Sequence, residues 1–153
     1  MAVLAIFSCN SESITEENLP EKKIFIPEIL KGKTEIEFFV KSTETEVNRL
    51  SIQKQQLTSE YKSLSSESNR KNVLMADIKK VTINGRINNA FTKLSEIYNE
   101  IDLQSSAFES NLNDEQKKAL RVITGELKKK IENTMIEYKL IEKKQKSGKI
   151  IFY

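Results

Sequence analysis

The feature that most limits what this chain can fold into is its distribution of proline. Of 153 residues only Pro20 and Pro27 are proline, so well over a hundred consecutive residues follow without one. Proline breaks helices because it lacks the backbone N–H and clashes with the preceding turn. Charged residues make up 31% of the chain and hydrophobic residues 38%, a mixture typical of amphipathic helices. The sequence therefore predicts an all-α fold.

The first long helix is predicted from Thr34 to about Ser66. Thr34 is a candidate N-cap, and Glu37 stands three residues later, at the spacing of a capping box. Apolar residues then recur at alternating intervals of four and three, the heptad pattern of helices that pack lengthwise. The stripe is apolar at seven of nine positions: Ile36, Val40, Thr43, Val47, Leu50, Lys54, Leu57, Tyr61 and Leu64.

The middle region leaves the number of helices open. The expected stripe consists of Leu74, Ile78, Val81, Ile87, Phe91, Leu94, Tyr98 and Ile101, with a phase shift at Asn84-Gly85. Asn-Gly is a strong turn signal. Either a loop at Gly85 separates two helices, or one long helix carries a local defect. One long helix is favoured because a split would leave a first piece of only about three turns. The next connection is expected at residues 104–111.

The last helix is predicted to begin at Asn113, which has Gln116 at capping-box spacing, and to end at Ser147-Gly148. Its stripe is Leu120, Ile123, Leu127, Ile131, Met135, Tyr138 and either Leu140 or Ile141. The predicted architecture is an antiparallel bundle of three, or four, long helices spanning residues 34–153. The apolar tail at residues 150–153 is expected to fold back onto the core.

The N-terminus resembles the end of a bacterial lipoprotein signal peptide over residues 1–9. An apolar run leads through the small Ser8 to Cys9, the only cysteine, which would carry the lipid. No Lys or Arg precedes Cys9 and the apolar run is only Ala2 to Phe7, so the signal would be truncated. The alternative is a frayed apolar N-terminus on a cytosolic helical protein, with Cys9 a bystander.

Residues 10–33 are predicted to be a flexible tether, because their composition is polar and acidic. An apolar segment within this range is expected to dock on the domain: Ile24, Phe25, Ile26, Ile29 and Leu30.

Catalytic chemistry finds little support in the sequence. The absence of histidine removes the commonest general base and nearly all zinc sites, and a single cysteine excludes an internal disulfide. Glu96 and Glu100 share one helix face, but such pairs are usually solvated surface. We therefore expect no enzyme, no catalytic residue, no metal and no cofactor.

Positive charge is concentrated near the C-terminus. Residues 117–153 contain 11 basic and 4 acidic residues, whereas residues 9–46 contain 5 basic and 9 acidic. The candidate polyanion-binding residues are Lys117, Lys118, Arg121, Lys128, Lys129 and Lys130. A solvated face that supports solubility is the competing interpretation. A glycosaminoglycan or an acidic protein is the expected partner of such a face, and nucleic acid is not expected for an exported chain.

The chain resembles the plasmid-encoded outer-surface lipoproteins of Borrelia, either the exported proteins of the EppA/BapA type or the complement-regulator-acquiring group. The resemblance rests on Ile6-Phe7-Ser8-Cys9-Asn10, on the acidic tether, on the Lys-, Asn-, Ile- and Glu-rich helical body and on the run from Leu112 to Leu120. It implies a palmitate-bearing lipoprotein on the outer membrane surface that interacts with host molecules. No binding residue transfers by motif.

Two functions follow as expectations. The first is a lipid-anchored, non-enzymatic surface protein that binds host molecules or aids immune evasion through its helix faces. The second is a cytoplasmic coiled-coil structural or assembly protein, whose helices pair between chains through the heptad stripes. A monomer and a homodimer both remain open.

Overall fold

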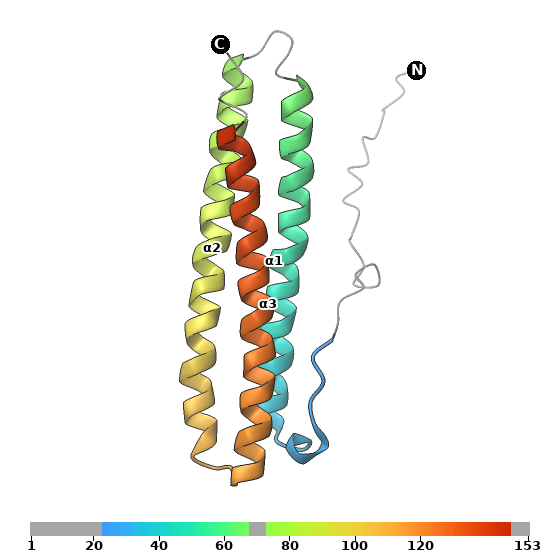
Figure 1. The fold of residues 1–153 in the computed structure, drawn as a ribbon, viewed down its shortest axis with the longest axis vertical. Coiled ribbons are helices and arrows are strands. Elements are labelled where there is room, and N and C mark those ends of the chain that lie inside the picture. The colour runs from blue at the N-terminus through green and yellow to red at the C-terminus, as the bar shows by residue number, and fades with distance from the viewer. Residues whose placement is uncertain (1–22, 68–72, 148–153) are drawn as a thin grey trace, which may run out of the picture.

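The described part of the chain folds as an all-α bundle. The computed structural model describes residues 23–67 and 73–147. Three long helices, α1 (Thr34–Glu67), α2 (Val73–Glu109) and α3 (Asp114–Ser147), lie side by side and alternate in direction (Figure 1). Each helix packs against the other two. The predicted antiparallel helical bundle is confirmed, with three long helices in these residues.

Helix α2 runs through Gly85 without interruption, so the alternative of a turn at that position is wrong. Gly85 is exposed, and a Cβ built there meets no atom within 4 Å. Glycine is tolerated inside such a long helix because the packing of the apolar face outweighs its low helix propensity.

We expect Gly85→Ala to raise the free energy of unfolding by about 0.5–1 kcal/mol, because alanine loses less backbone entropy on entering a helix. Chemical denaturation at low protein concentration measures the change. Gly32→Ala is the matched control, since Gly32 has a φ of +83° and alanine is strained there. Equal destabilisation by both substitutions would contradict the expectation.

The core is formed by one stripe from each helix. The buried cluster contains Ile36, Val40, Val47, Leu50, Leu57 and Leu64 of α1, Ile83, Ile87, Ala90, Leu94 and Ile101 of α2, and Leu120, Ile123, Leu127, Ile131, Tyr138 and Ile141 of α3. Ile141 rather than Leu140 faces inward. Lys54 occupies a stripe position of α1 because its ammonium group reaches the core edge and pairs with Glu137 of α3.

The first two turns of α2 differ from the prediction. Leu74, Ile78 and Val81 are exposed, whereas Ala76 and Ile83 are buried. The phase is set further along the helix, where Ile87 and its successors face the core. Because the helix continues unbroken, the face that carries Ile87 also carries Ile83, four residues earlier, and Ala76, seven residues before that. Leu74, Ile78 and Val81 therefore lie on the opposite side of the helix.

Helix α1 begins differently from the prediction, because Lys33 rather than Thr34 precedes its first turn. The Lys33 carbonyl accepts the first helical hydrogen bond from Glu37, at 3.0 Å. The Glu37 side chain reaches back to accept from the Gly32 N–H at 2.7 Å. The positive φ of Gly32 turns the chain so that this N–H points at the helix start.

The predicted capping box of the last helix is confirmed. The Gln116 N–H donates to Asn113 Oδ1 at 2.9 Å, and the Asn113 N–H donates to Gln116 Oε1 at 3.2 Å. Two backbone donors at the start of α3 are thereby satisfied.

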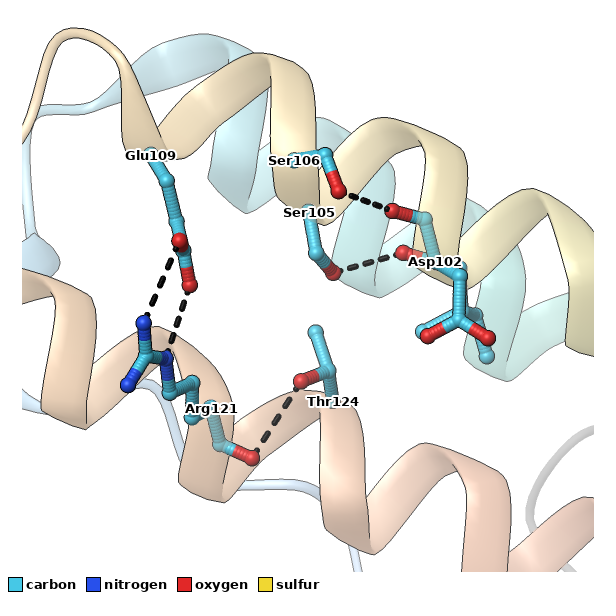
Figure 2. A network of polar contacts seen from close by, with 7 residues as sticks. Asp102, Ser105, Ser106, Glu109, Arg121 and Thr124 are labelled. Carbon is cyan, nitrogen blue, oxygen red and sulfur yellow. Dashed lines mark hydrogen bonds and ion pairs between the residues drawn. The ribbon is translucent and has the colours of Figure 1, made fainter.

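The connection expected at residues 104–111 is shorter, because α2 continues to Glu109. The hydroxyls of Ser105 and Ser106 donate to the carbonyls of Ile101 and Asp102, one turn earlier, so these serines fit within the helix (Figure 2). Phe108 also packs edge-on against Phe39 of α1, with ring centroids 5.7 Å apart. This contact anchors the last turn.

A short N-terminal strap, residues 24–30, packs on the bundle and ends in the 3₁₀ turn η2 (Glu28–Leu30). Leu30 is completely buried in the core cluster, and Ile24 and Ile26 pack against it. Docking is therefore confirmed for Ile24, Ile26 and Leu30, whereas Phe25 and Ile29 are 73% and 39% exposed. Packed structure begins inside the range 10–33 that the composition assigns to a tether.

Some expectations concern residues outside the described ranges. These are the signal-like residues 1–9 with Cys9, the tether residues 10–22 and the apolar tail at 150–153.

Candidate functional site

The basic residues of α3 mostly face acidic residues of the neighbouring helices. Arg121 forms a two-pronged ion pair with Glu109 of α2, with Nε–Oε1 and Nη2–Oε2 distances of 2.8 and 3.3 Å (Figure 2). The Arg121 guanidinium lowers the pKa of the Glu109 carboxyl, and Glu109 in turn raises the pKa of Arg121. The pair lies beside the short α2–α3 connection and joins the two helix ends.

Lys128 also faces α2. Its ammonium group pairs with Asp102 and lies 4.6 Å from the centroid of the Tyr98 ring. The Tyr98 hydroxyl donates to Glu132 of α3 at 3.1 Å, and this bond raises the pKa of Tyr98. Lys128 is thus engaged by an acid and by an aromatic face at the α2–α3 boundary.

Lys130 faces the other neighbour, α1. Its Nζ lies 3.5 Å from Oε1 of Glu44, a buried carboxylate that also accepts the Ile24 N–H of the strap at 2.9 Å. Glu44 thus connects α1 to Lys130 of α3 and to Ile24 of the strap.

The six predicted polyanion-binding residues are therefore not brought into one patch. Arg121 and Lys128 face α2, and Lys130 faces α1. Lys118 and Lys129 are exposed, and Lys117 is half-buried. Cross-helix pairing depends on the register between helices, so the spacing of lysines along one helix cannot reveal it.

Glu96 and Glu100 line a shallow hollow between α1 and α2, together with Phe39, Ser42 and Thr43. Glu100 accepts a hydrogen bond from Gln104 at 2.6 Å. Within the two described ranges, no group of three or more His, Cys, Asp or Glu residues is arranged to hold a metal ion.

The strongest candidate for a contact surface is a line of exposed apolar residues on α2, which the sequence pattern predicts to be part of the core. Leu74, Ile78 and Val81 follow one line on the outer side of α2 and are 74%, 52% and 71% exposed. The line continues through Gly85, Asn88 and Thr92, all exposed and uncharged. We call these six residues the outer strip of α2. Beyond Thr92 the same spacing reaches Ser95, which is also uncharged.

The outer strip differs from the corresponding surface of α3. There the exposed line of Lys118, Val122, Gly125 and Lys129 carries a charge at two of four positions. Exposing large apolar residues to water is energetically unfavourable, so a contiguous group of them on a helix face marks a contact surface. The spacing signal was present in the sequence, but it does not say which side faces inward.

Nothing outside the chain assigns this surface a role. No helix in residues 23–67 and 73–147 has a long enough apolar stretch to cross a membrane. The chain matches no protein-family model, no curated protein and no solved structure.

Proposed function

We propose that this chain is a lipid-anchored bacterial surface protein, with the lipid on Cys9. It acts as a non-enzymatic binding module that meets host molecules through its helix faces and thereby serves host interaction or immune evasion.

The observation that carries the proposal is the seating of the strap on the bundle. Within the described residues, the Ile24 N–H donates to Glu44 and Leu30 is buried in the core. The sequence from Cys9 to this point is polar and acidic. A cysteine at a lipidation-like junction, a polar spacer and a helical body follow one another in the order expected of a displayed lipoprotein.

Host proteins and glycosaminoglycans are the proposed partner classes. Of the six candidate polyanion-binding residues, the exposed Lys118 and Lys129 would contribute most to binding a glycosaminoglycan. Arg121, Lys128 and Lys130 already pair with carboxylates, and a polyanion would have to compete for them.

The test is the intact mass of the protein expressed in a lipoprotein-processing bacterium from the full upstream reading frame. We expect cleavage before Cys9, a mass increase from acyl chains and recovery in the detergent phase. Cys9→Ala should abolish all three. Ser8→Ala is the matched control, because it keeps a small residue before the cysteine and should still be acylated. An unmodified mass beginning at Met1 would contradict the proposal.

The second candidate, a cytoplasmic coiled-coil assembly protein, is favoured by the outer strip of α2. Its apolar residues are spaced by four and three, as in a helix pairing seam. In the described residues the heptad stripes of α1 and α3 are buried within the bundle, so the outer strip of α2 is the apolar line proposed for pairing between chains. The unmodified mass described above would make this function the leading one.

A further inference from the structure

The apolar end of the outer strip is large for a surface in contact with water. Leu74, Ile78, Val81 and the adjacent Met75 are each more than half exposed. Together they present roughly 400 Å² of apolar surface, which is within the range of the largest patches found on soluble monomers. Burying it would release free energy in proportion to its area.

The spacing of the strip indicates the shape of what covers it. Leu74, Ile78, Val81, Gly85, Asn88 and Thr92 alternate by four and three residues. A line with this spacing stays in contact with a second helix that runs lengthwise beside it. Gly85 lies in the middle of the line, and a Cβ there meets only open space, so a partner helix can approach closely.

The charge pattern indicates that this helix is α2 of a second copy. In a parallel pair of α2 helices each residue on the line lies near its own equivalent, so any charge on the line would face its like. None of the six residues is charged, in a chain in which 31% of residues are. Parallel helices also meet at the flanking positions, and only one of these is charged: Met75, Asp77, Thr82, Asn84, Asn89 and Phe91.

A parallel arrangement fits better than an antiparallel one. In a parallel pair the apolar half of one strip meets the apolar half of the other, and Asn88 faces Asn88. The two Asn88 amides can then pair by hydrogen bonds, since each carries both a donor and an acceptor. In an antiparallel pair that overlaps the whole strip, Leu74 would instead lie against Thr92 and Ile78 against Asn88 of the other copy.

We propose that the chain forms a parallel homodimer through the outer strip of α2, in which Leu74, Ile78 and Val81 pack against their equivalents. The inference goes beyond the proposed lipoprotein function and does not depend on a lipid at Cys9, and it specifies the pairing on which the second candidate function rests. A standard interface buries about 800 Å² per partner, so this contact is at the small end and the dimer is a weak one.

Sedimentation velocity of the full chain, from micromolar to near-millimolar concentration, is the first test. Reducing conditions keep Cys9 from linking two chains. We expect a concentration-dependent dimer. Ile78→Glu should weaken it by about a hundredfold, because it places two carboxylates in the desolvated seam. Ile136→Glu on α3 is the matched control, with 56% exposure against 52% for Ile78, and should leave the dimer unchanged.

Disulfide trapping tests the arrangement. Cys9→Ser gives a chain without cysteine, so a single new thiol can be read cleanly. Val81→Cys in that background should form an interchain disulfide on oxidation, because Val81 meets its equivalent only in the parallel pair. Val122→Cys, exposed to a similar extent on α3, should not.

Three outcomes would overturn the proposal. A monomer at every concentration would leave the strip to a partner of another kind. A dimer equally sensitive to Ile78→Glu and Ile136→Glu would place the interface elsewhere. A dimer weakened by Ile78→Glu but not trapped through Val81→Cys would exclude the parallel arrangement.

Discussion

Replacing Tyr138 with alanine should lower the free energy of unfolding by about 3–5 kcal/mol, as for other large aromatic residues removed from a core. Tyr138 is the largest fully buried side chain of the described core. Its hydroxyl donates to the Leu50 carbonyl at 2.6 Å and so links α3 to α1. Alanine would leave a cavity between these helices and remove the donor.

Tyr138→Phe separates the two contributions. The ring is kept and the hydrogen bond to Leu50 is lost, so we expect a loss of about 1 kcal/mol. Tyr98→Phe is the control, because its hydroxyl bonds Glu132 at the surface and should matter little. Urea denaturation of the four proteins gives the values. An alanine variant as stable as the phenylalanine variant would show that the ring is not packed in the core.

High pH offers an independent check on the same hydroxyl. Burial raises the pKa of Tyr138 to about 12, although Arg49 and Arg86 oppose the shift. The unfolded chain, with an ordinary tyrosine pKa near 10, ionises first and is therefore favoured as the pH rises from 10 to 12. The stability advantage of the wild type over Tyr138→Phe should be constant below pH 10 and shrink above it. Lysine titration affects both proteins alike and cancels in the difference.

Replacing Leu30 with alanine should lower the free energy of unfolding by about 2–4 kcal/mol, because its side chain is completely buried. The residue belongs to η2, outside the three long helices, and closes one end of the core. The loss of its contacts would also loosen Ile24 and Ile26. Thermal or urea unfolding of the full chain measures the effect.

Ile29→Ala is the matched control for Leu30→Ala. Ile29 lies in the same turn but is 39% exposed, so its substitution should cost well under half as much. Equal and small effects of the two substitutions would show that the strap does not contribute to the folded unit, and that the domain begins near residue 34.

The sequence is most informative where one stripe dominates a helix. In α1 and α3 a single apolar line is flanked by charged residues, and the buried residues Leu50, Leu127 and Ile131 follow from spacing alone. The capping box at Asn113 follows from residue chemistry, since both side chains act within one turn. These features are local, so neighbouring helices do not alter them.

The sequence is least informative in α2, which has two lines with the same spacing. Leu74, Ile78 and Val81 look more like core than Ala76 or Ala90, because size and hydropathy favour them. The buried line is selected by Ile87 and Leu94 further along the helix, and only if the helix passes Gly85 unbroken. The outer strip could therefore not be recognised before the phase of the whole helix was known.

The candidate basic surface on α3 illustrates a different limit. A helix places Lys128 and Lys130 about 200° apart around its axis, and the sequence shows this separation. It does not show that Asp102 of α2 and Glu44 of α1 lie opposite these two lysines, because that depends on the axial register between the helices. Ion pairing between elements distant in sequence is thus the part of the site that needs a three-dimensional structure.

The strap has a consequence for the order in which the molecule assembles. The helices are joined consecutively by short connections, so their pairing involves little loop closure and should be fast. The side-chain amide of Gln116, at the start of α3, donates a hydrogen bond to the Ile29 carbonyl of the strap at 3.4 Å. The two residues are 87 positions apart in the sequence. The strap can dock only after α3 has returned beside α1, and so it should join last and detach first. Weakening it would then accelerate unfolding while leaving the folding rate nearly unchanged.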